Sequence, residues 1–511
     1  MKRMNKILML FLAGLSAIPA LSLAPTNIPP SLVPEVPSLA PDYFCTWNIQ
    51  GYVVSYEGGE PTRAVMNEKY LLGRGTYEGW LDFYPKIRKD LYFVMDDSWD
   101  IPQGVNTSNN PCLGMAELDS TRFPSFKGTA GERLKNLSDM VKDRGWKGLG
   151  GWICAQAAEA DKRHADFPAY WAAKLKDAAY AGFSYWKVDW GRHSHDGKWR
   201  KALTDLAHVY APNLYVEHAL VPGCIAYSDV YRTYDIENIT AVPVTLQRIA
   251  EQLTHKVQPG YAGIINCEDE PYIAAGLGCA IGIMRHPFSG KLPDGRQDFV
   301  FPPVGRNLKM RLDEVTRAVR WHRIDLPFGV NADAHIDSVK LTDTWLLHAN
   351  ETYVSRPLGQ SIVEDAPARI SRNMPLPRIS GLYGKEQPYV LASKYPNGAI
   401  AVATIERTLG RKCLLKREVV HIDIDRLSTP IGIFGDYESL VLEYAERIKR
   451  GRIRVLAQDL AGDLAMDITK EVDIEAHRIS IPGVLIRKVG LSAATPNDLS
   501  MPGMVLRVFE E

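Results

Sequence analysis

Residues 184–191 read S-Y-W-K-V-D-W-G, a short apolar and aromatic run that contains a lysine and ends on an aspartate. The segment before it, 166–181, carries Tyr170, Trp171 and Leu175 at spacings that fall on one face of a helix. A helix followed by a buried strand is the repeating unit of a parallel sheet. The prediction of a parallel sheet therefore depends on whether this unit recurs along the chain.

The unit does recur between residues 43 and 330. Segments with helical spacing, such as Gly131–Arg144, separate further apolar runs of strand length. This alternation predicts a (β/α)8 TIM barrel over residues 43–330. A doubly wound open sheet is the alternative, but it lacks a glycine-rich first turn here. The other apolar runs are Tyr43–Trp47, Leu91–Met95, Gly148–Ile153, Leu214–Val216, Val230–Tyr234 and Tyr261–Ile265, with a weaker eighth near Ile283–His286.

The pattern changes from about Ser338 onward. Strand-like runs replace the strand–helix alternation, and P-N-G at Pro396–Gly398 is typical of a hairpin turn. This pattern predicts a C-terminal all-β domain, an antiparallel sandwich over residues 331–511. Its aromatic residues are not clustered, which favours a domain that packs on the barrel over a carbohydrate-binding module.

Composition and the N-terminus limit the class of protein. The 511 residues carry 60 basic and 60 acidic side chains, so nothing favours nucleic acid or an anionic membrane as partner. A basic head followed by an apolar run predicts a signal peptide over residues 1–24, with a membrane anchor as the alternative. A proline-rich leader over 25–42 follows, and we expect export to the periplasm or the medium.

Polar residues cluster where the predicted barrel strands end, which is where barrel proteins place their sites. Any one of them could be a helix cap or a structural ion pair. Together they bring several carboxylates and indoles to one barrel face, an arrangement that suits the hydroxyls and C–H surfaces of a neutral sugar. The seventh run leads into C-E-D-E at 267–270, which supplies Glu268, Asp269 and Glu270, and Asp269 is taken as the candidate. The candidates are Trp47, Asp96, Asp97, Trp152, Lys187, Asp189, Glu217, Arg232, Asp235 and Asp269.

Hydrolysis of a glycoside requires two carboxyl groups in opposite protonation states. The cation of Lys187 would keep Asp189 ionised. Asp235 follows Tyr231 and Tyr234 in the sequence, a setting that could hold a proton, although Arg232 would work against this if it pointed at Asp235.

These motifs resemble glycoside hydrolase clan D, which contains the α-galactosidases of families 27 and 36. K-V-D at 187–189 resembles the K-x-D nucleophile motif of the clan, and F-V-M-D-D-S-W at 93–99 resembles its D-D-x-W. Weaker likenesses are C-T-W-N at 45–48 to G-W-N-S-W and Y-R-T-Y-D-I at 231–236 to the segment with the acid/base aspartate. N-C-E-D-E-P-Y-I at 266–273 is a looser likeness to W-N-D-P-D-M-L.

The resemblance implies a retaining exo-acting hydrolase that needs no cofactor or metal, with an oligosaccharide or polysaccharide as substrate. Asp189 would be the nucleophile and Asp235 the acid/base. Glu217 with Leu220 matches the pattern that accompanies a free 2-hydroxyl, which favours galactose over N-acetylgalactosamine. The residues expected to contact the terminal sugar are Trp47, Asp96, Asp97, Trp152, Lys187, Glu217, Arg232 and Asp269.

The chain also departs from the clan's pattern. His218 stands where the family has tryptophan, and the arginine-to-acid spacing is one residue shorter, so Glu237 is a rival acid/base. A β-L-arabinopyranoside remains open as substrate. Two other classes are alternatives: a metal-dependent hydrolase built on H-S-H-D at 193–196, and a sugar-binding barrel without turnover.

Overall fold

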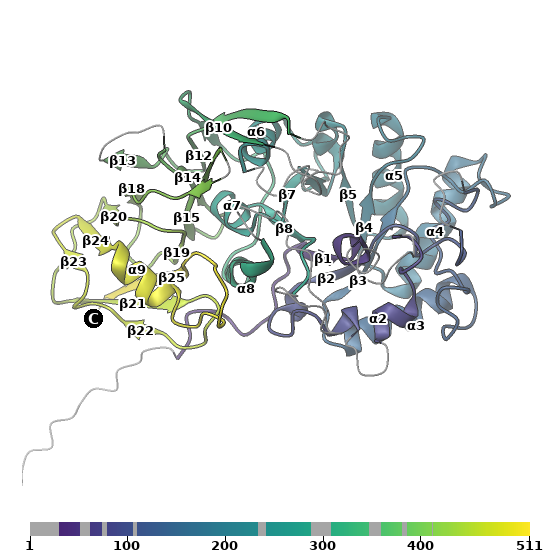
Figure 1. The fold of residues 1–511 in the computed structure, drawn as a ribbon, viewed down its shortest axis with the longest axis horizontal. Coiled ribbons are helices and arrows are strands. Elements are labelled where there is room, and N and C mark those ends of the chain that lie inside the picture. The colour runs from purple at the N-terminus through teal and green to yellow at the C-terminus, as the bar shows by residue number, and fades with distance from the viewer. Residues whose placement is uncertain are drawn as a thin grey trace, which may run out of the picture.

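The computed structural model describes residues 30–51, 62–73, 79–105, 110–233, 242–287, 308–346, 359–380, 386–410 and 412–510. Figure 1 shows two parts side by side, a barrel surrounded by helices and a β-rich part that contains the C-terminus. Within the described ranges, no helix is both long and apolar enough to cross a membrane.

Eight parallel strands close into a barrel, in the order β1 to β8, with β8 pairing back onto β1. The predicted (β/α)8 fold is confirmed. The last two strands differ in position from the apolar runs in the sequence, because β7 begins three residues later than expected and β8 three residues earlier. The strands are β1 Tyr43–Cys45, β2 Tyr92–Met95, β3 Gly148–Ile153, β4 Tyr185–Val188, β5 Tyr215–His218, β6 Val230–Arg232, β7 Ile264–Glu268 and β8 Ala280–Ile283.

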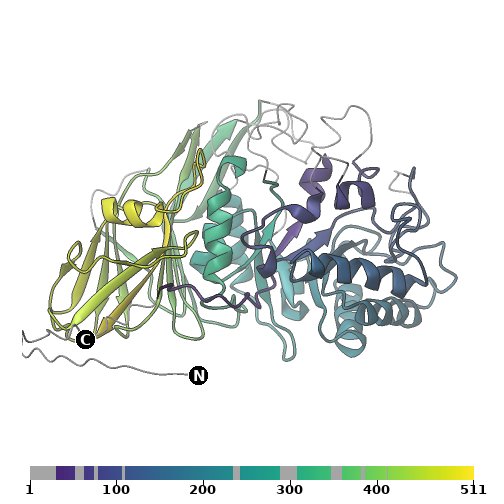
Figure 2. The ribbon, with the colours of Figure 1, turned by 90° about the horizontal axis from the view of Figure 1, so that it is seen from below.

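Helices cover the outside of the barrel (Figure 2). The helix before β4 shows how the sequence sets their ends: Asp166 accepts a hydrogen bond from the Ala169 amide at 3.2 Å, and Gly182 ends the helix with φ +64°. The helices are α2 Glu68–Leu72, α3 Ala130–Asp143, α4 Phe167–Ala181, α5 Gly197–Tyr210, α6 Val242–Gln252, α7 Pro271–Leu277 and α8 Leu312–Trp321, with 3-10 turns at Trp80–Asp82, Arg88–Asp90, Pro222–Tyr227 and Leu308–Met310.

Tyrosine rings fill the interior of the barrel. The ring centroids of Tyr43 and Tyr185 lie 5.1 Å apart, and Tyr92 and Tyr215 pack beside them. Because aromatic side chains occupy the lumen, polar side chains at the carboxyl ends of the strands rest on an apolar floor.

The C-terminal part is a sandwich, as predicted. An apolar core lies between an eight-stranded sheet, β22-β21-β25-β19-β15-β14-β12-β9, and a five-stranded sheet, β13-β18-β20-β24-β23. Most neighbouring strands pair antiparallel, with parallel pairs at β12–β14, β15–β19 and β18–β20. A four-stranded sheet, β11-β10-β16-β17, lies beside them.

The elements of this part follow one another closely along the chain. They are β9 Ala334–Ile336, β10 Lys340–Leu346, β11 Ser361–Pro367, β12 Arg369–Arg372, β13 Arg378–Ser380, β14 Tyr389–Lys394, β15 Ile400–Ile405, β16 Arg407–Gly410, β17 Lys412–Leu414, β18 Val419–Ile424, β19 Ile431–Phe434, β20 Ser439–Tyr444, β21 Ile453–Asp459, β22 Met466–Asp467, β23 Asp473–Ile474, β24 Arg478–Pro482, α9 Gly483–Gly490 and β25 Gly503–Glu510.

Helices α7 and α8 join the two parts (Figure 1). Trp321 of α8 packs against Tyr395 and Phe434 of the sandwich, at centroid distances of 5.6 and 6.1 Å. One apolar core therefore runs from the barrel helices into the large sheet. Residues 30–42, the purple segment of Figure 2, connect the same two parts, and Leu32 and Val33 are buried.

Candidate active site

The candidate site lies at the carboxyl ends of the barrel strands. Asp189 follows directly after β4, and Trp152, Lys187 and Arg232 come from β3, β4 and β6. All four side chains are buried, and Asp189 is 7% exposed. The barrel has therefore brought candidates from separate strands into one polar cluster.

Asp189 makes two contacts that favour its charged form. The indole Nε1 of Trp152 donates to Asp189 Oδ2 at 3.0 Å, and Arg232 Nη2 lies 3.3 Å from Oδ1. Burial by itself would raise the pKa of this carboxyl, but the nearby charges of Arg232 and Lys187 and the Trp152 hydrogen bond outweigh it and lower the pKa below its usual value. Asp189 is thus an ionised carboxylate at neutral pH.

The direct partner of Lys187 is Asp96 rather than Asp189. Lys187 Nζ donates to Asp96 Oδ2 at 2.8 Å, and the thiol of Cys45 donates to the same oxygen at 2.8 Å. Arg232 is closer to Asp189 than Lys187 is, and of the nearby charges it lowers the pKa of Asp189 the most. Lys187 acts on Asp189 through its charge and not through a hydrogen bond.

Glu217 lies deeper, within reach of the tyrosine floor. It is fully buried, and its carboxylate accepts from Tyr185 Oη at 2.7 Å, Asn266 Nδ2 at 2.6 Å and Tyr43 Oη at 3.3 Å. Burial raises its pKa, although Arg232, whose Nε lies 3.4 Å away, opposes the shift. Protein donors already engage both oxygens, so Glu217 holds Arg232 in place from below.

The end of β7 brings a different acid to the site from the one chosen on sequence. Glu268 meets Arg232 Nη1 and Tyr43 Oη, at 3.4 and 3.3 Å. Asp269 instead faces Arg285 and accepts hydrogen bonds from the amides of Met284 and Arg285. Alternation along β7 was the signal available in the sequence, because residues 264, 266 and 268 share one face of a strand.

Asp97 is also occupied by a protein partner. Arg63 Nη2 and Nε donate to Asp97 Oδ2 at 2.8 and 3.0 Å, and Ser98 donates to Oδ1 at 2.8 Å. Burial raises the pKa of Asp97, with Arg63 opposing the shift. The guanidinium of Arg63 also lies 5.7 Å from the ring centroid of Trp190. Arg63 belongs to none of the sequence motifs, so nothing in the sequence indicated that it would pair with Asp97.

The two tryptophans expected to contact the terminal sugar, Trp47 and Trp152, differ in exposure. Trp152 is 1% exposed and contributes its N–H edge to Asp189, as described above. Trp47 is partly exposed and packs against the apolar cluster inside the barrel. Asp235 and its rival Glu237 lie outside the described residues, as does the rest of segment 234–241.

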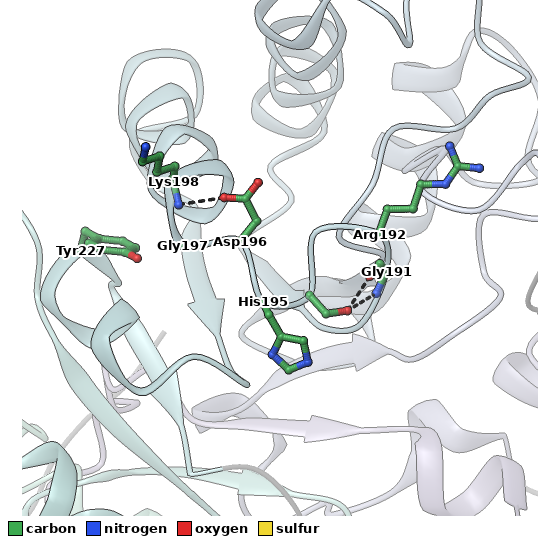
Figure 3. Close-up of a pocket in the computed structure, with 8 residues that line it drawn as sticks. Gly191, Arg192, His195, Asp196, Gly197, Lys198 and Tyr227 are labelled. Carbon is green, nitrogen blue, oxygen red and sulfur yellow. Dashed lines mark hydrogen bonds between the residues drawn. The ribbon is translucent and has the colours of Figure 1, made fainter.

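A hollow of about 770 Å³ lies beside the site, between the loops that follow β4 and β5 (Figure 3). Its lining includes Gly191, His195 and Tyr227. Arg192 and Lys198 also border it but point to different sides, so their cations do not converge.

The H-S-H-D segment serves to begin helix α5. Asp196 accepts hydrogen bonds from the amides of Lys198 and Trp199, both at 3.1 Å, and lies 3.2 Å from His193 Nδ1. In the part of the chain that the structure describes, no group of three or more His, Cys, Asp or Glu side chains is arranged to hold a metal ion.

No protein-family profile matches this sequence, and no curated protein does. Among solved structures, the chain is similar to a candidate α-galactosidase from Bacteroides fragilis, with 12% identity, a TM-score of 0.43, and coverage of 92% of this chain and 79% of that one. A family 27 β-L-arabinopyranosidase from Geobacillus stearothermophilus has 12% identity and a TM-score of 0.37, with coverage of 92% of this chain and 95% of that one. A candidate α-N-acetylgalactosaminidase from Bacillus halodurans has 11% identity and a TM-score of 0.40, with coverage of 94% of this chain and 99% of that one.

The TM-scores are low, so the barrel is assigned from its own strand order and the chemistry from its own side chains.

Proposed function

We propose that this protein is a retaining exo-glycoside hydrolase of the α-galactosidase type, which removes a terminal α-D-galactosyl residue by double displacement. The observation that carries the proposal is the environment of Asp189, a buried carboxylate held between the Trp152 indole and the Arg232 guanidinium. A charged oxygen with a lowered pKa at the mouth of a barrel suits nucleophilic attack on an acetal carbon.

In the first step a carboxylate oxygen of Asp189 attacks the anomeric carbon. The bond from that carbon to the leaving oxygen breaks, and Asp235 gives its proton to the departing alcohol. In the second step Asp235 takes a proton from water, the resulting oxygen attacks the same carbon, and the ester to Asp189 breaks. Two inversions at one carbon return the original α configuration.

The polar groups around Asp189 suit recognition of sugar hydroxyls. Asp96 and Lys187 form a buried ion pair whose remaining lone pairs and protons can accept from and donate to hydroxyls. Arg232 stands 3.3 Å from the attacking carboxylate and can also reach a hydroxyl beside the anomeric carbon. Trp47, partly exposed at the end of β1, offers an indole face to the C–H side of the ring.

The test is hydrolysis of a panel of p-nitrophenyl glycosides by the purified protein. The panel holds the α-D-galactoside, the β-L-arabinopyranoside and the α-N-acetylgalactosaminide, and NMR follows the first-formed product. We expect fastest release from the α-D-galactoside and initial appearance of α-galactose. First formation of β-galactose would rule out double displacement, and binding of galactose without release from any substrate would favour the non-catalytic sugar-binding class.

The role of Asp189 is checked with the variant Asp189→Asn. The amide removes the attacking charge while keeping the shape, so kcat should fall by at least about 1,000-fold. Asp205→Asn, on the outer helix α5 where Asp205 pairs with Lys201 at 2.8 Å, is the matched control and should keep wild-type kcat. Equal rates for Asp189→Asn and the wild type would remove Asp189 from the chemistry.

We also propose that the protein is exported, on the basis of the basic and apolar residues at its N-terminus. N-terminal sequencing of the mature protein should find a start near residue 25. A retained Met1 in the membrane fraction would instead indicate an anchor.

A further inference from the structure

Helix α5 carries an arginine whose side chain lies at the end of β4. Arg200 is 0% exposed, and its guanidinium donates to three backbone carbonyls: Ser194 O from Nε at 2.9 Å, Val188 O from Nη1 at 3.2 Å and Asp189 O from Nη2 at 2.7 Å. One side chain thus spans the end of β4, the residue after it and the loop beyond.

The carbonyls that Arg200 binds lie past the end of strand pairing on that side. The register of β4 with β5 ends at Lys187 opposite Glu217, whereas on the other side the Asp189 amide still donates to Ile153 O of β3 at 3.0 Å. Arg200 therefore replaces the missing strand partner. The backbone of Asp189 is held from both sides, by β3 through its N–H and by Arg200 through its C=O.

A buried histidine completes the surroundings of Arg200. His218 Nδ1 lies 3.2 Å from Arg200 Nη1, and its Nε2 lies 2.8 Å from Thr204 Oγ1. Thr204 Oγ1 donates to Arg200 O at 3.2 Å, so it accepts from Nε2–H and leaves Nδ1 as the acceptor for Arg200. Burial and the neighbouring Arg200 lower the pKa of His218 well below its usual value, which keeps the ring neutral.

The acceptors of Arg200 in the described part of the chain are three carbonyl oxygens and one imidazole nitrogen. No carboxylate there hydrogen-bonds this cation. Burying a guanidinium is costly unless its protons are satisfied, and an unneutralised charge acts over several ångströms in a medium of low dielectric. The arrangement orients the backbone of Asp189 and places a permanent positive charge behind its carboxylate.

We propose that Arg200 is a positioning residue for the nucleophile, which it fixes through the Val188 and Asp189 carbonyls, and that His218 is present to accept the second proton of Arg200 Nη1. The inference rests on the proposed role of Asp189. It also gives a reason for His218, one of the positions at which the chain departs from the clan D pattern. The charge of Arg200 is among those that lower the pKa of Asp189 against the effect of burial, the largest single influence.

The test compares Arg200→Gln and Arg200→Lys with Arg372→Gln. Arg372 is an equally buried arginine that donates to carbonyls of Leu277, Gly278, Phe328 and Gly329, away from the site, so it controls for the loss of a buried guanidinium. Arg200→Gln should lower kcat roughly 10- to 100-fold, the range for a slightly misplaced reacting group, with little change in KM.

The pH profile of kcat/KM separates positioning from general stability. In Arg200→Gln the acid limb should move to higher pH, because the carboxylate loses one of the cations that favour its ionised form. In Arg200→Lys, which keeps the charge but cannot reach all three carbonyls, kcat should fall while the acid limb stays in place. Arg372→Gln should lower Tm and leave both kcat and the acid limb unchanged. Identical profiles for Arg200→Gln and Arg372→Gln would overturn the inference.

A crystal structure of Arg200→Gln gives a readout that needs no turnover. The peptide after Val188 should shift, and the 3.0 Å hydrogen bond between Trp152 and Asp189 should lengthen beyond hydrogen-bonding distance. An unmoved Asp189 would overturn the positioning role even in an active enzyme. A wild-type protein that hydrolyses no glycoside would refute the proposed function, while this measurement still decides whether Arg200 sets the position of Asp189.

Discussion

At the scale of single residues, Arg232 is the centre of the candidate site. Its guanidinium lies 3.3 Å from Asp189, 3.4 Å from Glu217 and 3.4 Å from Glu268, and it is 2% exposed. Removing this one cation would leave three buried acids without their shared partner. Arg232 therefore affects both the stability of the fold and the protonation of Asp189.

We expect Arg232→Gln to lower the free energy of unfolding at pH 7.5 by about 3–5 kcal/mol, because it leaves buried carboxylates without their cation. Asp189 has a lowered pKa in the folded protein, so its contribution to stability is present above the unfolded pKa and is lost as pH falls through the folded one. The difference between variant and wild type should therefore shrink as the pH falls below about 4, the pKa of an aspartate in the unfolded chain.

Urea unfolding at pH 7.5 and at lower pH measures this difference. Arg192→Gln is the control, since Arg192 pairs with Glu159 at the surface and is 64% exposed in its side chain. It should change stability by about 0.5 kcal/mol or less at either pH. A loss for Arg232→Gln that is equal at all pH values would show that packing rather than charge is responsible.

At the scale of elements, the loop after β4 depends on a close backbone approach. Gly191 has φ +151°, and a Cβ at this position would lie 2.7 Å from Ala155 N in the loop after β3. Two hydrogen bonds join these loops, from Ala155 N to Trp190 O at 2.8 Å and from His193 N to Ala155 O at 2.9 Å. Only glycine allows the two loops to meet without displacing the chain beside Asp189.

We expect Gly191→Ala to lower kcat/KM on an aryl glycoside about 10-fold or more, because the added methyl group pushes the end of β4 away from its position. Gly223→Ala is the matched control, since a Cβ there meets nothing within 4 Å and the residue lies in the neighbouring loop after β5. Steady-state kinetics of both variants measure the effect. Full activity in Gly191→Ala would show that the loop adapts freely.

Sequence patterns predicted the elements well and the direction of individual side chains less well. Apolar runs and helical spacing located the barrel strands. Among the acids in C-E-D-E, however, Asp269 was the predicted site residue, and it faces Arg285, whereas Glu268 faces Arg232. Direction follows from the register of β7, which begins at Ile264 and not at Tyr261. A shift of one residue in a strand reverses which side chains face inward.

At the scale of the whole molecule, the barrel and the sandwich share one core. Helix α8 faces the sandwich with Trp321, and Arg317 of the same helix forms a buried ion pair with Asp459 of β21 at 2.8 Å. Without the sandwich, these apolar and charged groups would be exposed to water. The main structural role of the C-terminal part is therefore to shield the side of the barrel formed by α7 and α8 from water.

We expect the full-length protein to unfold in a single cooperative transition, because the shared core couples both parts. A chain ending at residue 330 should be insoluble or lack a cooperative transition, since α7 and α8 would lose their cover. Calorimetry and solubility of the two chains measure this. A soluble, cooperatively folding 43–330 fragment would show that the barrel is an independent domain.

The sequence by itself determined the fold class, the order of the barrel elements and the nucleophile candidate, because apolar periodicity and K-V-D are properties of adjacent residues. Only the tertiary structure decided the partners. It paired Lys187 with Asp96, Arg63 with Asp97 and Glu268 with Arg232, and it brought Arg200 against the carbonyl of Asp189. The reason is physical: local periodicity follows from the geometry of one strand or helix, whereas the charge that faces a buried carboxylate comes from segments far apart in the chain, which only barrel closure brings within a few ångströms.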